Sequence, residues 1–91
     1  MAIAHARKQT VSTSVDYDPA NLRFIPMTTV SLTGSGTATI TATHLDNNAV
    51  TLCSGIVTPA EPFTVFGYGY TKITVTKDSG TVYASFASSG I

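Results

Sequence analysis

The sequence predicts an all-β fold, a small antiparallel sandwich of six or seven strands. In Gly36–Thr43, four threonines alternate with Ala38, Ile40 and Ala42. Successive side chains of a strand point to opposite faces, so this segment predicts a strand with an apolar inner face and a hydroxyl outer face. From Met27 onward, strand-like and turn-like segments alternate about every ten residues, which is typical of sandwiches and barrels. No segment shows the apolar stripe of a helix.

Six strands are expected after residue 26, separated by turn sequences. Gly34-Ser-Gly36 is expected to end the first strand, and Asp78-Ser-Gly80 to form a tight hairpin, because glycine adopts positive φ without steric cost. The loop at 58–62 contains two prolines, which cannot lie inside a central strand. The strands are expected around Val30 and Leu32, at 37–44, around Val50 and Leu52, and at 63–66, 72–77 and 81–86.

The same alternation predicts the core. Ile40 is expected on the packed face between two alanines, while Thr39 and Thr41 face solvent. Ordering a chain of this size costs more free energy than burial of these side chains returns, so stability is expected to need further contacts. The predicted inward residues are Val30, Leu32, Ile40, Val50, Leu52, Phe63, Val65, Ile73, Val75, Val82 and Phe86.

Residues 1–26 differ in composition from residues 27–91, and we interpret them as an extended N-terminal arm beside the sandwich domain. They hold three of the five basic residues and two of the four prolines. A frayed terminus is the alternative interpretation. Within the arm, a short strand is possible at 11–15, Asp16–Asn21 has turn chemistry, and Leu22, Phe24 and Ile25 form a small apolar anchor.

The chain is made soluble by hydroxyl groups rather than by charge. It has 16 threonines and 9 serines among 91 residues, only 11% charged residues and a formal net charge of zero. No electrostatic attraction to nucleic acid or to an anionic membrane is therefore expected. A neutral surface also lacks the repulsion that keeps monomers apart, which fits a protein that works in an assembly.

The N-terminus predicts synthesis without a signal peptide. Arg7 and Lys8 follow four short apolar residues, whereas a signal peptide places its charges first and its apolar run second. No stretch approaches the roughly 20 apolar residues of a membrane helix, and the lone Cys53 allows no intrachain disulfide. Leaderless synthesis with Thr- and Ser-rich strands of exterior type is a combination found in phage virion proteins. We therefore expect synthesis in the host cytoplasm and a final location in the virion.

The sequence contains no catalytic or metal-binding pattern, and we expect neither enzyme activity nor a cofactor. A nucleophilic enzyme brings together a nucleophile, a base and an orienting group, and the chain has no Gly-x-Ser-x-Gly motif. His5 lies in the arm, and His44 is interpreted as an edge histidine at the end of its strand. Cys53 and the histidines lack zinc spacing, and Asp16-x-Asp18 lacks the further carboxylates of a calcium loop.

The segment 66–73 partly resembles the first ribonucleoprotein motif of RNA-recognition domains, in which aromatic side chains on a sheet stack on bases. Gly-Tyr-Gly-Tyr at 67–70 matches that motif, but Phe66 stands at its basic position. RNA-recognition domains also need two helices, which this sequence does not predict. We therefore interpret Tyr68 and Tyr70 as half-exposed side chains at a strand bend, suited to a protein–protein contact.

Gly36–Thr43 also resembles a strand of the bacterial group 2 immunoglobulin-like modules, which recur in adhesins and in phage head and tail proteins. The resemblance covers eight residues and implies an immunoglobulin-like sandwich. In those modules the stretch lies near the C-terminal end, whereas here it lies near the start of the domain. The resemblance assigns no functional residue.

Together these features predict a phage virion structural protein with the overall character of small capsid decoration (cement) proteins. The arm and one face of the sandwich would bind the major capsid protein or another virion protein, and the chain would form homo-oligomers in the particle. The alternative is a carbohydrate- or receptor-binding tail module that stacks sugars on Tyr68, Tyr70 and Tyr83. The predicted partner-binding residues are Arg7, Lys8, Arg23, Phe24, Ile25, Tyr68 and Tyr70.

Overall fold

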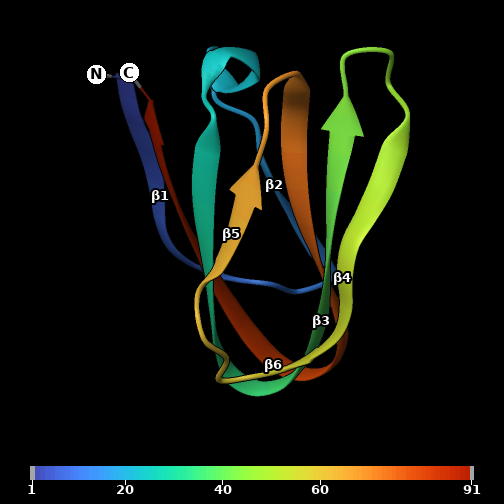
Figure 1. The fold of residues 1–91 in the computed structure, drawn as a ribbon. Coiled ribbons are helices and arrows are strands. Elements are labelled where there is room, and N and C mark those ends of the chain that lie inside the picture. The colour runs from blue at the N-terminus through green and yellow to red at the C-terminus, as the bar shows by residue number, and fades with distance from the viewer. Residues whose placement is uncertain (1, 91) are drawn as a thin grey trace.

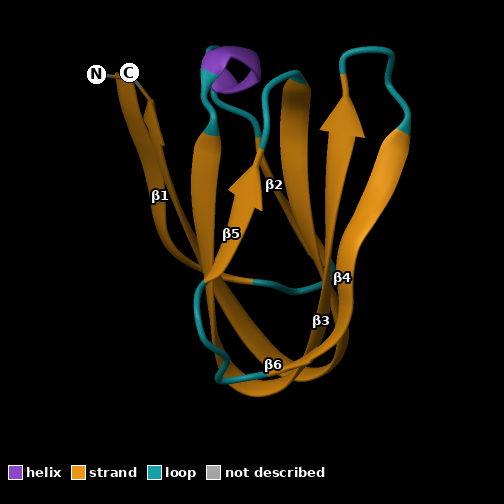
Figure 2. Ribbon diagram, viewed as in Figure 1, coloured by secondary structure: helices purple, strands orange, loops and turns teal. Residues whose placement is uncertain are grey.

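The computed structural model describes residues 2–90 and is built almost entirely of strands (Figures 1 and 2). All strand pairs are antiparallel, and the six strands form one sheet, which confirms the predicted all-β class. The elements are β1 (Ala2–Thr10), β2 (Ser14–Tyr17), the short 3₁₀ helix η1 (Leu22–Phe24), β3 (Met27–His44), β4 (Ala49–Val57), β5 (Phe63–Phe66) and β6 (Tyr70–Gly90).

Two long strands, β3 and β6, pair along their whole length and organise the sheet. One half of this pair carries β5 beside β3 and β1 beside β6, and the other half carries β4 beside β3 and β2 beside β6. In Figure 1 both long strands turn at the lower end and run back upward. The protein therefore has two facing layers, which belong to one continuous folded sheet rather than to two separate sheets.

Glycines make the bend in the two long strands. Gly34 and Gly80 have φ values of +104° and +70°, which side chains with a Cβ rarely adopt. Gly36 lies opposite Gly80 in the ladder, and a Cβ at Gly36 would collide with the carbonyl oxygen of Ser79. The expected strand end at 34–36 and the expected hairpin at 78–80 are therefore wrong. Both are bends within single strands, because the backbone turns there without leaving the ladder.

Inward side chains from both layers form one core. Ile40 has no solvent-exposed surface, as its alternation with threonine predicts, and most of the predicted core is buried. Val50 is the exception, because it is 38% exposed on β4, an edge strand whose pairing with β3 is irregular around Ile40. Leu52 and Phe63 are only partly buried against the core.

The N-terminal segment is part of the sheet and of the core, which differs from the expected extended arm. β1 and β2 both pair with β6. Val11, Tyr17, Leu22 and Ile25 are buried. The first three belong to the main core cluster. These strands are short or carry few large apolar residues, so their pattern is weak in the sequence, and pairing with β6 fixes them.

A buried group of hydroxyls joins the two layers. The Tyr17 ring of β2 stacks on Phe86 with a centroid separation of 4.8 Å, and its hydroxyl donates a hydrogen bond of 2.9 Å to Ser88 Oγ. Ser88 Oγ also lies 2.6 Å from Thr28 Oγ1. Burial raises the pKa of Tyr17 above its usual value, and the Ser88 contact opposes this only in part. The segment predicted to be an arm thus supplies a central contact of the interior.

Candidate assembly surface

Exposed apolar side chains concentrate at one end of the molecule. The described residues include seven large apolar side chains with exposed surface, and five of them lie at the end formed by η1, the β5–β6 connection and the β3–β4 turn (Figure 1). We call this set the apolar end; its members are Phe24, Met27, Leu45, Phe66 and Tyr68.

Backbone hydrogen bonds hold the three segments of the apolar end together. The N–H groups of Gly67 and Gly69 donate to the carbonyl oxygens of Pro26 (2.9 Å) and Arg23 (3.0 Å), which ties the β5–β6 connection to η1. Met27 and Phe66 are partners in the β3–β5 ladder. Leu45 lies in van der Waals range of the position that a Cβ at Gly69 would occupy. The exposed side chains therefore stand on a fixed backbone.

Hydrogen bonds also fix the β3–β4 turn. Asn47 has a φ of +69°, and the Asp46 carboxylate accepts hydrogen bonds from the backbone and side-chain nitrogens of Asn48. These bonds lower the pKa of Asp46 below its usual value, with a smaller contribution from His44. His44 packs against the Tyr70 ring with centroids 5.1 Å apart, which agrees with its interpretation as an edge histidine.

The apolar end combines exposed aromatic side chains, a methionine and a nearby arginine. Phe24, Phe66 and Tyr68 are 66%, 71% and 69% exposed, and the Arg23 guanidinium lies 4.9 Å from the centre of the Phe24 ring. Among the described residues, no carboxylate lies within 4.0 Å of the Arg23 side chain. Aromatic residues, Met and Arg are enriched at interfaces and at the positions that dominate binding.

The structure brings only some of the predicted partner-binding residues together. Arg23, Phe24 and Tyr68 lie at the apolar end. Tyr70 is half-buried beside His44. Ile25 is only 2% exposed, so its side chain has no surface to offer to a partner and its predicted anchoring role does not fit the structure.

Arg7 and Lys8 lie elsewhere, at an irregularity in the β1–β6 ladder. The Lys8 ammonium sits 4.2 Å from the centre of the Tyr83 ring. Tyr83 pairs with Thr33, next to the glycine bend. Tyr83 therefore lies apart from Tyr70 in the ladder, and the three tyrosines named for the carbohydrate- or receptor-binding alternative do not form one shared stacking platform.

Sequence reasoning missed Met27, Leu45 and Phe66. A signal for Phe66 was available, because it follows Val65 on a strand and therefore has the opposite, outward parity. Met27 pairs with Phe66 and shares its exposure. Only the three-dimensional arrangement brings these two to the same end of the molecule as Leu45, which comes from a turn eighteen residues further along the chain than Met27.

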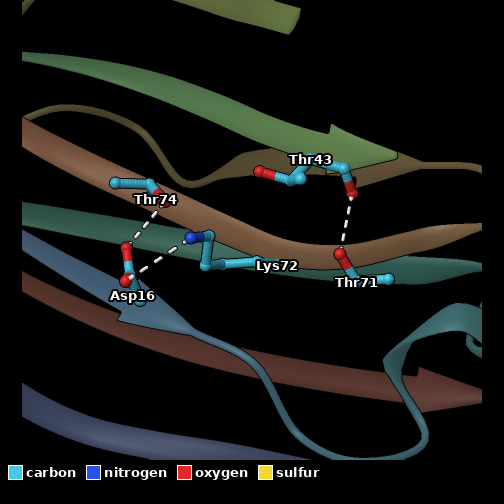
Figure 3. A network of polar contacts seen from close by, with 5 residues as sticks. All are labelled: Asp16, Thr43, Thr71, Lys72 and Thr74. Atoms are coloured by element: carbon cyan, nitrogen blue, oxygen red, sulfur yellow. Dashed lines mark hydrogen bonds and ion pairs between the residues drawn. The ribbon is translucent and has the colours of Figure 1, made fainter. Parts of the chain in front are cut away.

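The layer that contains β2 and β4 carries polar contacts on its outer face (Figure 3). The Asp16 carboxylate accepts a hydrogen bond of 2.8 Å from Thr74 Oγ1 and forms an ion pair of 3.8 Å with Lys72. Thr71 Oγ1 donates to the carbonyl oxygen of Thr43 at 3.4 Å. Both members of the ion pair are solvent-exposed to a large degree, so its effect on stability is small. We interpret these contacts as cross-strand support that joins β6 to β2 and to β3.

Three further features of the described residues concern metal-ligand groups, surface depressions and membrane-spanning helices. No group of three or more His, Cys, Asp or Glu side chains within it is arranged to hold a metal ion. An open depression beside η1 is lined by Asp18, Pro19, Ala20, Arg23 and Thr71. No helix in residues 2–90 has the length and apolar character needed to span a membrane.

Comparison with known proteins supports the fold. No protein-family model and no curated protein matches the chain. The crystal structure of the SPBc2 prophage-derived protein YomS is similar, with a TM-score of 0.66 and 13% identity over 97% of this chain and 95% of that one. The capsular polysaccharide assembling protein CapF from Staphylococcus aureus matches 94% of this chain with 23% of its own, at a TM-score of 0.50 and 12% identity.

A subunit of the Bacillus endospore appendages, described as disulfide-linked pili, aligns over 98% of this chain and 89% of its own, at a TM-score of 0.47 and 12% identity. That similarity is too distant to support an argument. The YomS match covers nearly all of both chains, so the two share their whole architecture. The resemblance to group 2 immunoglobulin-like modules has no counterpart among these matches.

Proposed function

We propose that this chain is a structural protein of a phage virion, and specifically a decoration protein of the capsid shell. The observation that carries the proposal is the apolar end, since a small protein of zero net charge that exposes three aromatic side chains on a rigid surface needs a protein partner to cover them. The shared architecture with a prophage-derived protein supports the phage context.

The mechanism is adhesive. In this proposal the chain adds buried apolar surface to the assembled particle, between its own copies or against the shell. About 25 cal/mol of stabilisation accompanies each Å² of apolar surface removed from water. The hydroxyl-rich outer faces of the two layers, such as the one that carries Thr39 and Thr41, stay in contact with solvent. Neither nucleic acid nor membrane is a partner in this proposal, because the net charge is zero and Lys72 is paired with Asp16.

Mass spectrometry of phage particles tests the proposal. Prophages in the source strain would be induced and the particles purified on a density gradient. The chain is expected in the fractions that contain the major capsid protein, in a fixed ratio to it. Its absence from purified particles, with the protein present in the lysate, would overturn the proposal. Its presence only in isolated tails would replace decoration by the receptor-binding alternative.

A further inference from the structure

We propose that the apolar end is covered by the apolar end of a second copy of this chain, in a two-fold symmetric dimer. The inference rests on the proposed function as an assembly protein and names the partner of this surface. Two properties of the surface support a second copy: the area it offers and the placement of its charges.

The area fits a dimer interface of ordinary size. Burial of one aromatic side chain removes about 150–250 Å² of surface from water, and the three aromatic residues of the apolar end are each about two thirds exposed or more. Together with Met27 and Leu45 they offer on the order of 500 Å² of apolar surface. The core of an interface is about 65% apolar, so such a patch belongs to an interface of roughly 800 Å² per partner, the usual size of a specific contact.

Two opposite charges, Arg23 and Asp46, flank the apolar end, and Asp18 lines the depression beside η1. Arg23 lies on η1 at one flank, Asp46 lies on the β3–β4 turn at the other, and the connection that carries Tyr68 runs between them (Figure 1). A two-fold axis that lies in the interface and runs along that connection, across the line from Arg23 to Asp46, would set Arg23 of each copy against Asp46 of the other. A net charge of zero means that two copies approach without repulsion.

In this arrangement the contact between two copies of the chain and the contact with the capsid shell use different surfaces. If copies meet through their apolar ends, the contact with the shell uses another surface, and the basic pair Arg7 and Lys8 on β1 remains available for it. Dimerisation in solution and incorporation into particles are then independent measurements.

Sedimentation velocity of the purified full chain over micromolar to millimolar concentrations tests the inference. A concentration-dependent dimer is expected. Phe66→Ser is expected to weaken it at least tenfold, whereas Val57→Ser is expected to leave it unchanged. Val57 is a matched control, because it is 70% exposed but pairs with Thr37 close to the glycine bend. A protein that stays monomeric at millimolar concentration would overturn the inference, as would equal effects of the two substitutions.

A charge exchange tests the proposed geometry. Arg23→Glu and Asp46→Lys are each expected to weaken the dimer, and the double variant to recover most of the loss. Asp46 also closes its turn, so circular dichroism of each variant and the milder Asp46→Asn, which keeps an acceptor for Asn48, separate loss of charge from loss of structure. No recovery in the double variant would overturn the two-fold arrangement.

Failure of the dimer and failure of the proposed function give different results. A wild-type monomer that is nevertheless found in virions shows that another virion protein covers the apolar end, which overturns the dimer and leaves the proposed function standing. If the chain dimerises in solution but is absent from purified particles, the dimer stands and the proposed function as a virion protein is overturned.

Discussion

The glycine bend and the apolar end lie at opposite ends of the molecule and differ in what restricts their residues. At the bend, Gly36 donates its N–H to Thr58 Oγ1 at 2.9 Å and accepts the Thr58 N–H at its carbonyl oxygen at 2.9 Å. A Cβ at Gly34, Gly36 or Gly80 would collide with backbone atoms of the facing strand. Residue identity at this end is therefore dictated by the backbone.

At the apolar end the backbone is also fixed, but its side chains point to solvent. Phe24, Phe66 and Tyr68 contribute little buried surface to the monomer, so the fold does not explain why they are large and aromatic. The residues that fix the bend and the exposed residues that we propose contact a partner are therefore separated along this molecule, with the shared core between them. Five experiments test that separation, from the largest expected effect on stability to the smallest.

Deletion of residues 1–21 is expected to abolish cooperative folding. It removes β1, β2 and the buried side chains of Val11 and Tyr17, and exposes the long strand β6 along one edge. Thermal denaturation followed by circular dichroism measures the effect, with Arg7→Ala/Lys8→Ala as a control expected to remain folded. A truncated protein with a native-like spectrum and a sharp transition would restore the interpretation of this segment as an arm.

Ile40→Ala is expected to lower the free energy of unfolding by about 2–5 kcal/mol, the usual range when a buried aliphatic side chain is truncated. Ile40 is completely buried between the two layers. Thr41→Ser, one position along on the outer face, is expected to change stability by no more than about 0.5 kcal/mol. Urea denaturation compares the two variants. A larger effect for Thr41→Ser would mean that the faces of β3 are assigned the wrong way round.

Gly36→Ala is expected to cost about 3 kcal/mol, at the upper end of the usual range for a single substitution, because the added methyl group collides with the backbone of β6. Gly55→Ala is the matched control. Gly55 has a φ of +66° but no atom within 4 Å of the added Cβ, so only a conformational cost of about 1–2 kcal/mol is expected. The same urea titration gives both values. Equal costs would show that packing at the bend does not restrict residue 36.

Tyr17→Phe is expected to cost about 0.5–1.5 kcal/mol at neutral pH, the net value of one hydrogen bond, because Ser88 keeps Thr28 as a partner. The variant should also lose part of the pH dependence. The pKa of Tyr17 is raised in the folded state, so its contribution is fully present below the unfolded pKa of about 10 and is lost as pH rises above it. Denaturation midpoints between pH 8 and 11 measure this. Parallel curves for the two proteins would contradict the assignment.

Phe66→Ser is expected to change the stability of the monomer by no more than about 0.5 kcal/mol, as is usual for an exposed position. Urea denaturation at low protein concentration isolates the monomer from any association. A loss of more than about 1 kcal/mol under those conditions would show that the apolar end is needed for folding, and would remove the contrast between the two ends.

The strands with strict alternation were predictable from the sequence. Ile40 and Val75 are buried partners on adjacent strands, where two-residue periodicity places both of them. The two long strands were not predictable. Gly36 and Gly80 each signal a turn in their own segment, and only the pairing between β3 and β6 shows that both strands continue through the bend. The pairing is a property of two segments more than forty residues apart.

The candidate site was less predictable than the fold. Phe24 and Tyr68 could be recognised as aromatic residues in irregular segments. Ile25 could not be separated from Phe24, since the two are neighbours in sequence and only burial distinguishes an interior side chain from an exposed one. Leu45 joins the patch through its position beside Gly69, which no local pattern reveals.

The position of β6 in the chain has a consequence for biosynthesis. β6 pairs with β1, β2 and β3, and it follows all three in the order in which the ribosome makes them. Until β6 emerges, the nascent chain holds those strands without their main partner, and unpaired apolar strand edges are prone to aggregate. The sheet is therefore expected to form only after β6 has been synthesised, and chains that terminate before β6 are expected to depend on chaperones for their solubility.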